Sequence, residues 1–334
     1  MRVLVATNMW PRPDDPGLGV FVRDQVRALR RRGVDVSVLA IDGADGKRRY
    51  LEAVGRIRRA LATADYDLLH AHYVLTGLAA VLAGAVRTGA APSRVPLLVT
   101  HHGVEVFDGW QAPLSRWVSR LADDTIVVSE EMAEHLGIAQ SRVVPMGIDL
   151  DLFRPGGRDG ARRALGLPQE RQIVAWIGAD RPEKRLGLAR AAVDTVRGAG
   201  TGAGGSGGDV VLHVVSGRPH EEVATHLQAA DCLLLTSRRE GAPMVVKEAL
   251  ACDVPVVSTA VGDVPELLDG VDGCTVAAPT PAALAAGINR ALAHGPVDGR
   301  ARAARFGADA MAARVLEVYE ELARAAEARH APPR

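Results

Sequence analysis

Two glutamates, Glu240 and Glu248, lie eight residues apart around a predicted turn between a strand and a helix. The run before them, 231–236, is short and apolar, as is typical of a buried parallel strand, and 254–258 is predicted to be the next strand. Glu240 would then lie in a loop at the carboxyl edge of a sheet. Glu248 would lie inside the following helix, so one acid stands at the edge where open α/β sheets bind their ligands.

The helix between these strands is expected to start at Pro243. Proline suits a first helical position, because its missing N–H costs nothing there and its φ is already helical. The free N–H groups and the dipole at such a helix start favour phosphate. Two acids at this spacing alone are more typical of a solvated surface, but the whole pattern 237–252, in its strand-turn-helix setting, favours a site for a phosphorylated ligand.

The segment 237–252 resembles the Glu-x7-Glu motif of the retaining glycosyltransferases of family four, which have the two-domain GT-B fold. The resemblance implies that Glu240 contacts the transferred sugar and that Glu248 contacts the ribose of the nucleotide. It also implies that the turn faces the sugar and the diphosphate, through Gly241, Ala242, Pro243, Met244 and Val245. Pro243 has no N–H to donate where many members of the family have an amide.

Basic residues follow the strand predicted at 172–177. Lys184 resembles the lysine that the family places on the donor phosphates, and a cation there would stabilise the diphosphate as negative charge builds on it. The family usually has an arginine where this chain has Ala179. Arg181 is therefore the expected partner of Lys184, with Arg185 as the alternative. A purely structural alternative is that these basic residues form a solvated helix cap and bind no ligand.

Two further positions are assigned by the same resemblance. Arg218 follows the strand predicted at 210–215, in the loop that would receive the nucleotide base. Gly19 stands at the start of the helix predicted at 20–32 and resembles the glycine loop that faces the donor diphosphate. The third glycine of a dinucleotide motif is absent here, so a nicotinamide site is not expected, and an ordinary flexible loop is the alternative.

Four histidines stand at the predicted ends of two strands in the first half of the chain. The run 100–105 resembles the family's His-Gly-x-acid loop, which selects His102 as the residue against the transferred sugar. His70, His72 and His101 are expected to be hydrogen-bonded loop or core residues. Their spacings match no recognised ligand pattern, so no metal site is expected. Asp149-x-Asp151 follows a strand at a domain junction and is interpreted as a turn.

Strands and helices alternate along the 334 residues, which predicts parallel, doubly wound sheets, and the length indicates two domains. The expected fold class is α/β of the GT-B type: two Rossmann-like domains with a cleft between them and a C-terminal crossing helix. The expected bounds are 1–150 for an acceptor-side domain, 151–308 for a nucleotide-sugar-binding domain and 309–334 for a helix that packs back on the first domain. A polar linker is expected after Phe153, and a flexible glycine-rich loop at 198–208.

Composition restricts the remaining choices. A net charge of zero argues against a general nucleic-acid binder. Residues 1–60 carry an excess of six positive charges. This excess fits solvated helix faces better than it fits the alternative, a weak contact with a membrane surface. The three cysteines lack metal spacing and fit a reducing compartment. The first apolar run is too short for a signal peptide, and the cytoplasm is therefore the expected location.

The functional expectation is a retaining glycosyltransferase that moves a sugar from a nucleoside-diphosphate donor to a hydroxyl acceptor, with no metal or other cofactor. The catalytic groups would be His102, Lys184 and Glu240. An epimerase or hydrolase of the same fold and a non-catalytic sugar-binding protein are the alternatives. The donor sugar, its base, the acceptor and the oligomeric state do not follow from these residues.

Overall fold

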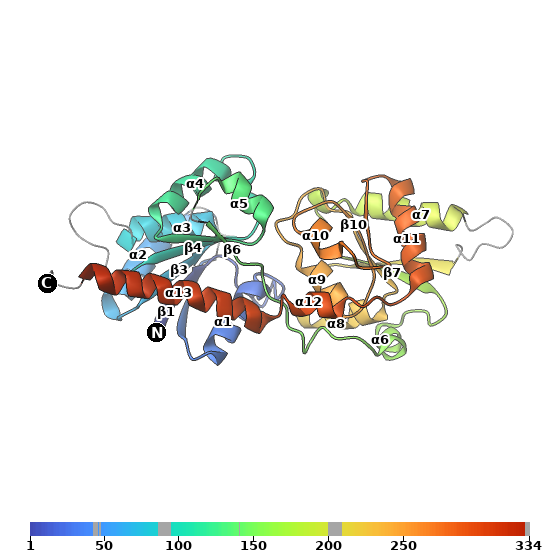
Figure 1. Ribbon diagram of the computed structural model, residues 1–334, viewed down its shortest axis with the longest axis horizontal. Coiled ribbons are helices and arrows are strands. Elements are labelled where there is room, and N and C mark those ends of the chain that lie inside the picture. Colours follow the sequence, from blue (N-terminus) through green and yellow to red (C-terminus); the bar gives the residue numbers. More distant parts are fainter. Residues whose placement is uncertain (43–45, 47, 86–94, 140, 200–208, 331–334) are drawn as a thin grey trace. The chain divides into compact units, whose positions relative to one another are not determined.

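The computed structural model describes residues 1–334 apart from 43–45, 47, 86–94, 140, 200–208 and 331–334. The chain divides into two compact units (Figure 1). The first comprises Met1–Arg12, Leu18–Gly147 and Ala308–Arg334, and the second comprises Pro13–Gly17 and Ile148–Gly307. Each unit has its own parallel sheet and its own core.

The first unit is built on a six-stranded parallel sheet with the strand order β2-β1-β3-β4-β5-β6. Its elements in chain order are β1 (Arg2–Thr7), α1 (Val20–Arg31), β2 (Asp35–Ala40), α2 (Arg48–Thr63), β3 (Leu68–His72), α3 (Val74–Ala80), the π-helix η1 (Val81–Ala85), β4 (Leu97–His101), the 3-10 helix η2 (Val104–Val106), α4 (Gln111–Leu121), β5 (Asp124–Val127), α5 (Glu130–Leu136), β6 (Ser141–Val143) and, from the end of the chain, α13 (Ala308–His330).

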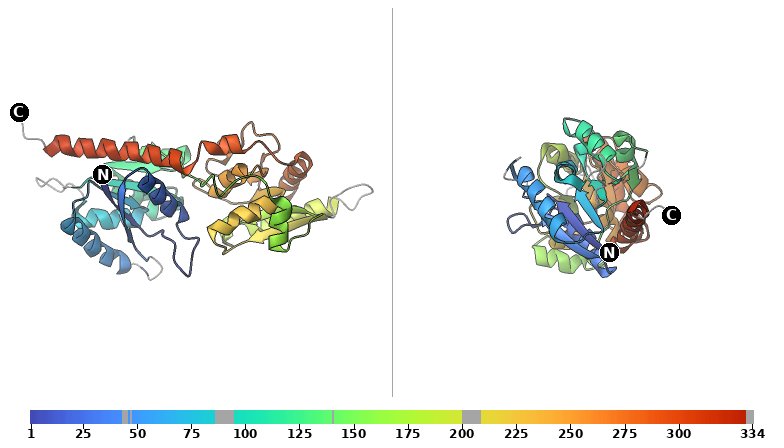
Figure 2. Two further views of the ribbon diagram at one scale, coloured as in Figure 1. Left: turned by 90° about the horizontal axis from the view of Figure 1, so that it is seen from below. Right: turned by 90° about the vertical axis from the view of Figure 1, so that its left-hand side faces the viewer.

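Helices cover both faces of this sheet, because successive strand residues point to opposite sides. Val3 and Val5 of β1 pack with α1 and α13, whereas Leu4 and Ala6 pack with α2 and α3. Helix α13 runs along the first of these faces (Figure 2). Its buried residues recur at helical spacing, as expected for one apolar stripe on a surface helix: Met311, Val315, Tyr319 and Leu322.

The second unit has a five-stranded parallel sheet with the order β11-β10-β9-β7-β8. Its elements are α6 (Arg158–Leu165), β7 (Gln172–Ile177), the 3-10 helix η3 (Pro182–Lys184), α7 (Leu186–Ala199), β8 (Val210–Val215), α8 (His220–Ala229), β9 (Cys232–Leu235), α9 (Met244–Ala251), β10 (Val256–Thr259), α10 (Val264–Leu268), β11 (Thr275–Ala277), α11 (Pro281–His294) and α12 (Arg300–Ala304).

The core of the second unit also has two layers. Val174 and Leu234 face α7 and α11, while Ala175, Leu233 and Leu235 face α8, α9 and α10. The central strands are therefore covered on both sides, which explains why they are continuous apolar runs rather than alternating ones. The expected α/β class with two parallel sheets is confirmed. Among the residues described, no helix is both long and apolar enough to cross a membrane.

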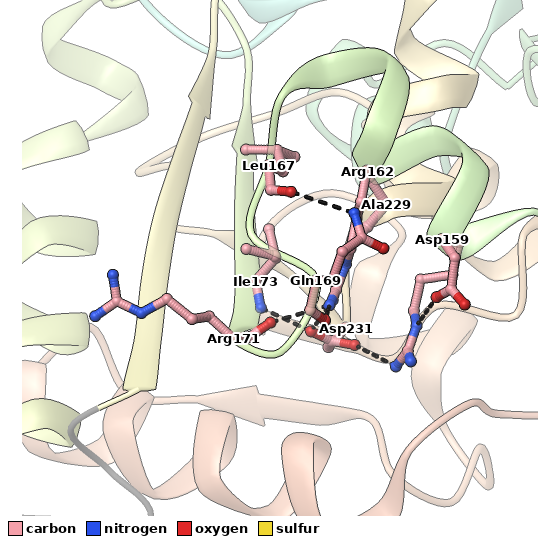
Figure 3. Close-up of polar contacts among 9 residues, drawn as sticks. Asp159, Arg162, Leu167, Gln169, Arg171, Ile173, Ala229 and Asp231 are labelled. Atoms are coloured by element: carbon pink, nitrogen blue, oxygen red, sulfur yellow. Dashed lines mark hydrogen bonds and ion pairs between the residues drawn. The ribbon is translucent and has the colours of Figure 1, made fainter.

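A buried arginine organises the amino-terminal edge of the second sheet (Figure 3). Arg162 of α6 is 1% exposed and donates to three carbonyls and one carboxylate, at Ala229 (3.0 Å), Gln169 (2.7 Å), Arg171 (3.0 Å) and Asp231 (2.5 Å). Asp231 also accepts from the N–H of Ile173, at 2.7 Å. These bonds satisfy a charge that would otherwise be costly to bury, and they join α6 to the starts of β7 and β9.

Several local expectations were wrong. The segment after Phe153 contains helix α6 and is not a simple linker. Pro243 is the residue before α9, with an extended ψ of 111°, and is not its first helical residue. The sequence 73–86, an apolar stretch that predicts one buried helix, instead forms α3 up to Ala80 and then the π-helical turn η1, where Gly84 has a φ of 90°. Most of the expected glycine-rich loop, 200–208, lies outside the described residues, and α7 extends to Ala199.

Other local features follow directly from the residue types. Ser129 suits a helix cap and accepts from the N–H of Met132 at the start of α5, and Gly137 ends that helix with a φ of 64°. Asp149 accepts from the N–H groups of Asp151 and Leu152, at 2.9 and 3.0 Å, which is the hydrogen bonding of a turn. Cys232 and Cys252 are buried free thiols in the core of the second unit.

Candidate functional site

The loops after β7 and β9 meet at the carboxyl edge of the second sheet, because these two strands are neighbours. Lys184 comes from the first loop and Glu240 from the second, and Lys184 Nζ lies 2.5 Å from Glu240 Oε1. Both side chains are partly accessible, at 28% and 15% of their full exposure. The structure therefore joins two of the residues selected from the sequence in one ion pair that a ligand can reach.

Hydrogen bonds fix these two loops to each other. Thr236 Oγ1 accepts from the indole N–H of Trp176 (3.1 Å) and donates to the carbonyl of Lys184 (2.7 Å). The N–H of Arg238 donates to the carbonyl of Glu183, at 2.7 Å. Because backbone positions on both sides of the ion pair are held, Lys184 and Glu240 are presented by a rigid frame.

Arg185 belongs to that frame and not to the open side of the site. Its Nε donates to the carbonyl of Thr236 (2.6 Å) and its Nη2 to the carbonyl of Ser237 (2.7 Å). Its backbone has a φ of 51°, which is unusual for a residue with a side chain. Arg181, in contrast, is exposed at the start of η3. Of the two arginines considered, Arg181 is therefore the one whose guanidinium remains available to a ligand.

The turn 241–245 leads into α9, which starts at Met244. The N–H groups of Met244 and Val245 lie in its first turn, where a helix has no carbonyl partner of its own. Gly262, with a φ of 51°, packs against this turn so closely that a Cβ would lie 2.6 Å from the carbonyl oxygen of Gly241. The backbone of the turn is thus fixed by a second loop at the same edge.

Glu248 lies one helical turn further along α9 and is 3% exposed. Its Oε1 is 2.7 Å from Nε2 of His220, the first residue of α8. The preceding residue, Lys247, is fully buried, with its Nζ 2.8 Å from Asp263 Oδ2 and 4.8 Å from the ring centre of Phe306. Neither His220 nor Asp263 was predicted from the sequence to belong to the site. Both follow strands at the same carboxyl edge, and that position was the available signal.

Arg218 follows β8, as expected from the sequence, and lies on the surface. Its Nη1 is 4.0 Å from Glu222 Oε2, with both side chains at least half exposed. Such a pair contributes little to stability, so the guanidinium can exchange this partner for another anion. The structure brings Arg218 to the same edge of the sheet as Glu248 but gives no contact between them.

In the first unit, His102 follows β4 and lies within a group of buried rings. Its Nε2 is 2.7 Å from Nδ1 of His72, and the two rings are stacked with centres 5.0 Å apart. Phe21 and Tyr73 pack against the same imidazole, at 4.8 and 5.2 Å. The N–H of His102 donates to Glu105 Oε1, at 3.0 Å. Nδ1 of His102 is buried and has no hydrogen-bond partner among the described residues.

Burial controls the charge of this histidine group. It lowers the pKa of His102 and of His70 well below the usual value, with neighbouring histidines adding to the effect, and it lowers the pKa of His72 to about 3. These three imidazoles are therefore neutral near pH 7. His70 Nδ1 contacts the hydroxyl of Tyr319 and its Nε2 that of Thr100, both at 2.7 Å, so His70 is the hydrogen-bonded core residue that was expected.

Gly19 precedes α1 in a left-handed conformation with a φ of 61°. A Cβ on this residue would lie 2.2 Å from the backbone of Met9, so no other residue fits without a shift of the chain. Gly19 therefore has a structural reason to be glycine. Its position at the start of a helix agrees with the expectation, whereas its contact with a diphosphate stays a prediction.

A hollow lies at the opposite, amino-terminal edge of the second sheet. It has a volume of about 470 Å³ and is lined by residues that include Arg158, Gln228 and Asp253. Among the described residues lining it, no buried side-chain nitrogen or oxygen lacks a hydrogen-bond partner. Since ligands of open α/β sheets bind at the other edge, the group around Lys184 and Glu240 is the better candidate. Within the described residues, no cluster of three histidine, cysteine or acidic side chains could hold a metal ion.

Comparison with known proteins gives two family matches. Residues 17–152 match the family described as Glycosyltransferase Family 4, and residues 173–294 match Glycosyl transferases group 1. Similar curated proteins include TuaC of Bacillus subtilis strain 168, a glycosyltransferase named for teichuronic acid biosynthesis, with 27% identity over 80% of this chain and 83% of TuaC. The D-inositol 3-phosphate glycosyltransferase of Mycobacterium bovis is 34% identical over 63% of this chain, and the match spans only about half (51%) of that relative.

Solved structures share the fold at low sequence identity. Sucrose-phosphate synthase from Thermosynechococcus elongatus superposes with a TM-score of 0.77 at 21% identity, covering 97% of this chain and all of that one. Anabaena HepE in complex with UDP-glucose superposes with a TM-score of 0.68 at 17% identity, covering 96% of this chain and 99% of that one.

Proposed function

Because the chain belongs to glycosyltransferase family 4, with the GT-B fold, and is a nucleotide-sugar-dependent glycosyltransferase, we propose that it transfers the sugar to a hydroxyl acceptor with retention of the anomeric configuration and without a metal ion. The observation that supports this most directly is the contact of 2.5 Å between Lys184 and Glu240 at the carboxyl edge of the second sheet. The cation there is proposed to bind the diphosphate of the donor, and the carboxylate is proposed to bind its sugar.

Lys184 is the group proposed to act on the leaving diphosphate. Its ammonium is partly accessible and held by an anchored loop, so it requires little reorganisation when negative charge develops on the phosphate. Arg181 is exposed at the start of η3 and is proposed as its partner. Gly19 and the N–H groups of Ala242, Met244 and Val245 are the proposed further donors to the sugar and phosphates, with Gly241 and Pro243 lining the turn.

Glu240 is proposed to bind the sugar hydroxyls and Glu248 the ribose hydroxyls. A carboxylate accepts hydrogen bonds from hydroxyl groups and offers two oxygens for them. Arg218 is proposed to border the base. The structure of HepE with UDP-glucose shows that a protein of this fold holds such a donor, and UDP-glucose is accordingly the first donor to test here.

His102 is proposed to contact the transferred sugar. Since its Nε2 is engaged by His72, Nδ1 is the ring atom left for a sugar hydroxyl. No residue is assigned as a covalent nucleophile. The leaving phosphate oxygen would instead take the proton from the acceptor hydroxyl as the new glycosidic bond forms on the same face of the sugar. Epimerase, hydrolase and non-catalytic functions are not retained as alternatives, because the family matches support a transferase.

Two measurements test this function. A thermal-shift panel of UDP, GDP, ADP and their glucose and mannose conjugates should single out one nucleotide, since a ligand at about one hundred times its Kd adds about 2.7 kcal/mol of stability. Turnover of that donor should then persist in EDTA, because Lys184 and helix N–H groups can neutralise the diphosphate. Loss of turnover on chelation, with recovery on addition of Mn²⁺ or Mg²⁺, would contradict the metal-independent mechanism.

A further inference from the structure

A histidine outside the family motif contacts the acid proposed to bind ribose. His220 Nε2 lies 2.7 Å from Glu248 Oε1, although the two residues are 28 positions apart in the sequence. Glu248 is 3% exposed and His220 is 16% exposed at its side chain. An ionised carboxylate can only accept hydrogen bonds, so Nε2 of His220 is the protonated ring nitrogen in this contact.

The fold holds His220 from two sides. It is the first residue of α8, directly after the loop that leaves β8, and this places it at the same carboxyl edge as Glu248. The ring of Phe153, which is fully buried, packs against the imidazole with the centres 5.2 Å apart and a tilt of 55°. A side chain restricted in this way can restrict its partner, because the hydrogen bond then selects one rotamer of Glu248.

We propose that His220 is a positioning residue that holds Oε1 of Glu248 and so directs the second oxygen, Oε2, toward the ribose hydroxyls of the nucleotide. This inference rests on the proposed function, because it takes Glu248 as the ribose-binding acid. Oε2 has no hydrogen-bond partner among the described residues, and it is not among the buried atoms that lack one, so it remains accessible to a ligand. A carboxylate that is already oriented loses less conformational freedom when the nucleotide binds.

The neighbouring histidine pair on α8 provides a matched control. His226 Nδ1 lies 2.8 Å from His213 Nε2, and this pair has no contact with Glu248. His226 is buried, so replacing it disturbs the packing of the same helix without removing the contact proposed to matter. His226→Ala therefore separates a general effect on α8 from the specific effect on Glu248.

The test compares UDP with its 2′,3′-dideoxy analogue, which lacks both ribose hydroxyls, by titration calorimetry. ADP or GDP and the matching analogue replace them if the nucleotide panel selects another base. Hydrogen bonds to a charged group are worth about 1.5–3 kcal/mol, so the wild type should bind the analogue roughly ten- to one-hundredfold more weakly. In His220→Ala this ratio should fall to about threefold or less, mainly because UDP itself binds more weakly. His220→Gln, whose amide nitrogen can replace Nε2, should restore most of the ratio, and His226→Ala should keep it.

Other outcomes would contradict the proposal at different points. A His220→Ala protein that is folded and still distinguishes UDP from the analogue as well as the wild type does would overturn the positioning role and leave the proposed function intact. Failure of His220→Gln to restore the ratio, while its melting temperature matches that of the wild type, would overturn it as well. A wild type that binds none of the nucleoside diphosphates would overturn the proposed function and this inference together.

Discussion

At the scale of single residues, the proposed chemistry depends most on Lys184. Lys184→Ala should lower kcat/KM about one-hundredfold or more, the range found when one preorganised donor to a transition state is removed. The fold should not change, because the side chain is partly exposed and its only ion-pair partner among the described residues, Glu240, is also partly accessible. Steady-state kinetics with the selected donor, together with thermal melting, would measure both effects.

One arginine variant extends that experiment to the second proposed phosphate ligand, and another serves as its control. Arg181→Ala should also lower kcat/KM, whereas Arg190→Ala, which removes an exposed charge from α7 in the same unit, should not. Equal losses in Lys184→Ala and Arg190→Ala would mean that general electrostatics, and not a specific contact, explains the effect. Normal kinetics in Arg181→Ala would remove that residue from the proposed phosphate site.

At the scale of residues, a sequence motif carries part of its own geometry, whereas the roles assigned to its residues stay predictions. Lys184 and Glu240 were selected separately, 56 positions apart, and the structure brings them into contact because β7 and β9 are adjacent. The contact of His220 with Glu248 was missed, because no local pattern links a residue at the start of α8 to one inside α9. Arg185 was considered as a phosphate ligand, but two backbone carbonyls occupy its guanidinium.

At the scale of elements, helix α6 shows why a polar segment need not be a linker. This helix has glycines at both ends and contains three arginines, so its buried face cannot be recognised in the sequence. The residue that anchors the helix is itself charged, Arg162. Hydrophobic periodicity cannot detect an arginine that is buried because three carbonyls and Asp231 surround it. The amphipathic helices α1 and α13 each bury an apolar stripe, so their hydrophobic periodicity was sufficient to predict them.

Replacing that arginine should reduce stability without affecting the site. Arg162→Met should lower the free energy of unfolding by about 3 kcal/mol or more, because it leaves three carbonyls without their donor and removes the buried cation that pairs with Asp231. Arg163→Met, one position further and exposed, should have little effect. Urea unfolding would measure both. The kcat/KM of the folded Arg162→Met protein should stay near that of the wild type, since the network lies at the edge of the sheet opposite Glu240, and a specific loss of turnover would contradict this separation.

The buried histidines of β3 and the one directly after β4 should make the free energy of unfolding depend on pH. His70, His72 and His102 have lowered pKa values in the folded protein, and in the unfolded chain a histidine titrates near 6.5. Below pH 6.5 the unfolded chain therefore binds more protons than the folded one. Above pH 6.5 this effect does not reduce the free energy of unfolding. As the pH falls toward 3, the free energy of unfolding decreases by about 1.4 kcal/mol per pH unit for each histidine.

Urea unfolding between pH 7.5 and 5 would measure this slope. His72→Asn should make it shallower, whereas His135→Asn, which removes an exposed histidine from α5, should change it little. A wild-type free energy of unfolding that does not change over this range would show that the buried imidazoles do not remain neutral.

At the scale of the whole molecule, the alternation of strands and helices predicted both sheets, and the C-terminal helix was expected from its apolar stripe. The donor and the acceptor could not be predicted in the same way. Their recognition depends on side chains from several loops and on backbone groups, which no single stretch of sequence specifies. For the same reason the family matches support a sugar donor but leave the acceptor open.

The central claim is that one sugar is transferred with retention of configuration. Inversion requires a base on the face of the sugar opposite the leaving phosphate, and Glu240 and Glu248 belong to the edge of the second sheet that is proposed to hold the phosphate side of the donor. His102, which is neutral near pH 7, is proposed to contact sugar hydroxyls instead. Under the proposed function, neither carboxylate activates the acceptor for inversion.

Proton NMR of the freshly formed product tests this claim most directly. Starting from an α-linked donor such as UDP-glucose, the proposed mechanism predicts an anomeric coupling constant characteristic of an α-linked product, measured before any later equilibration. An anomeric coupling characteristic of a β-linked product would contradict it.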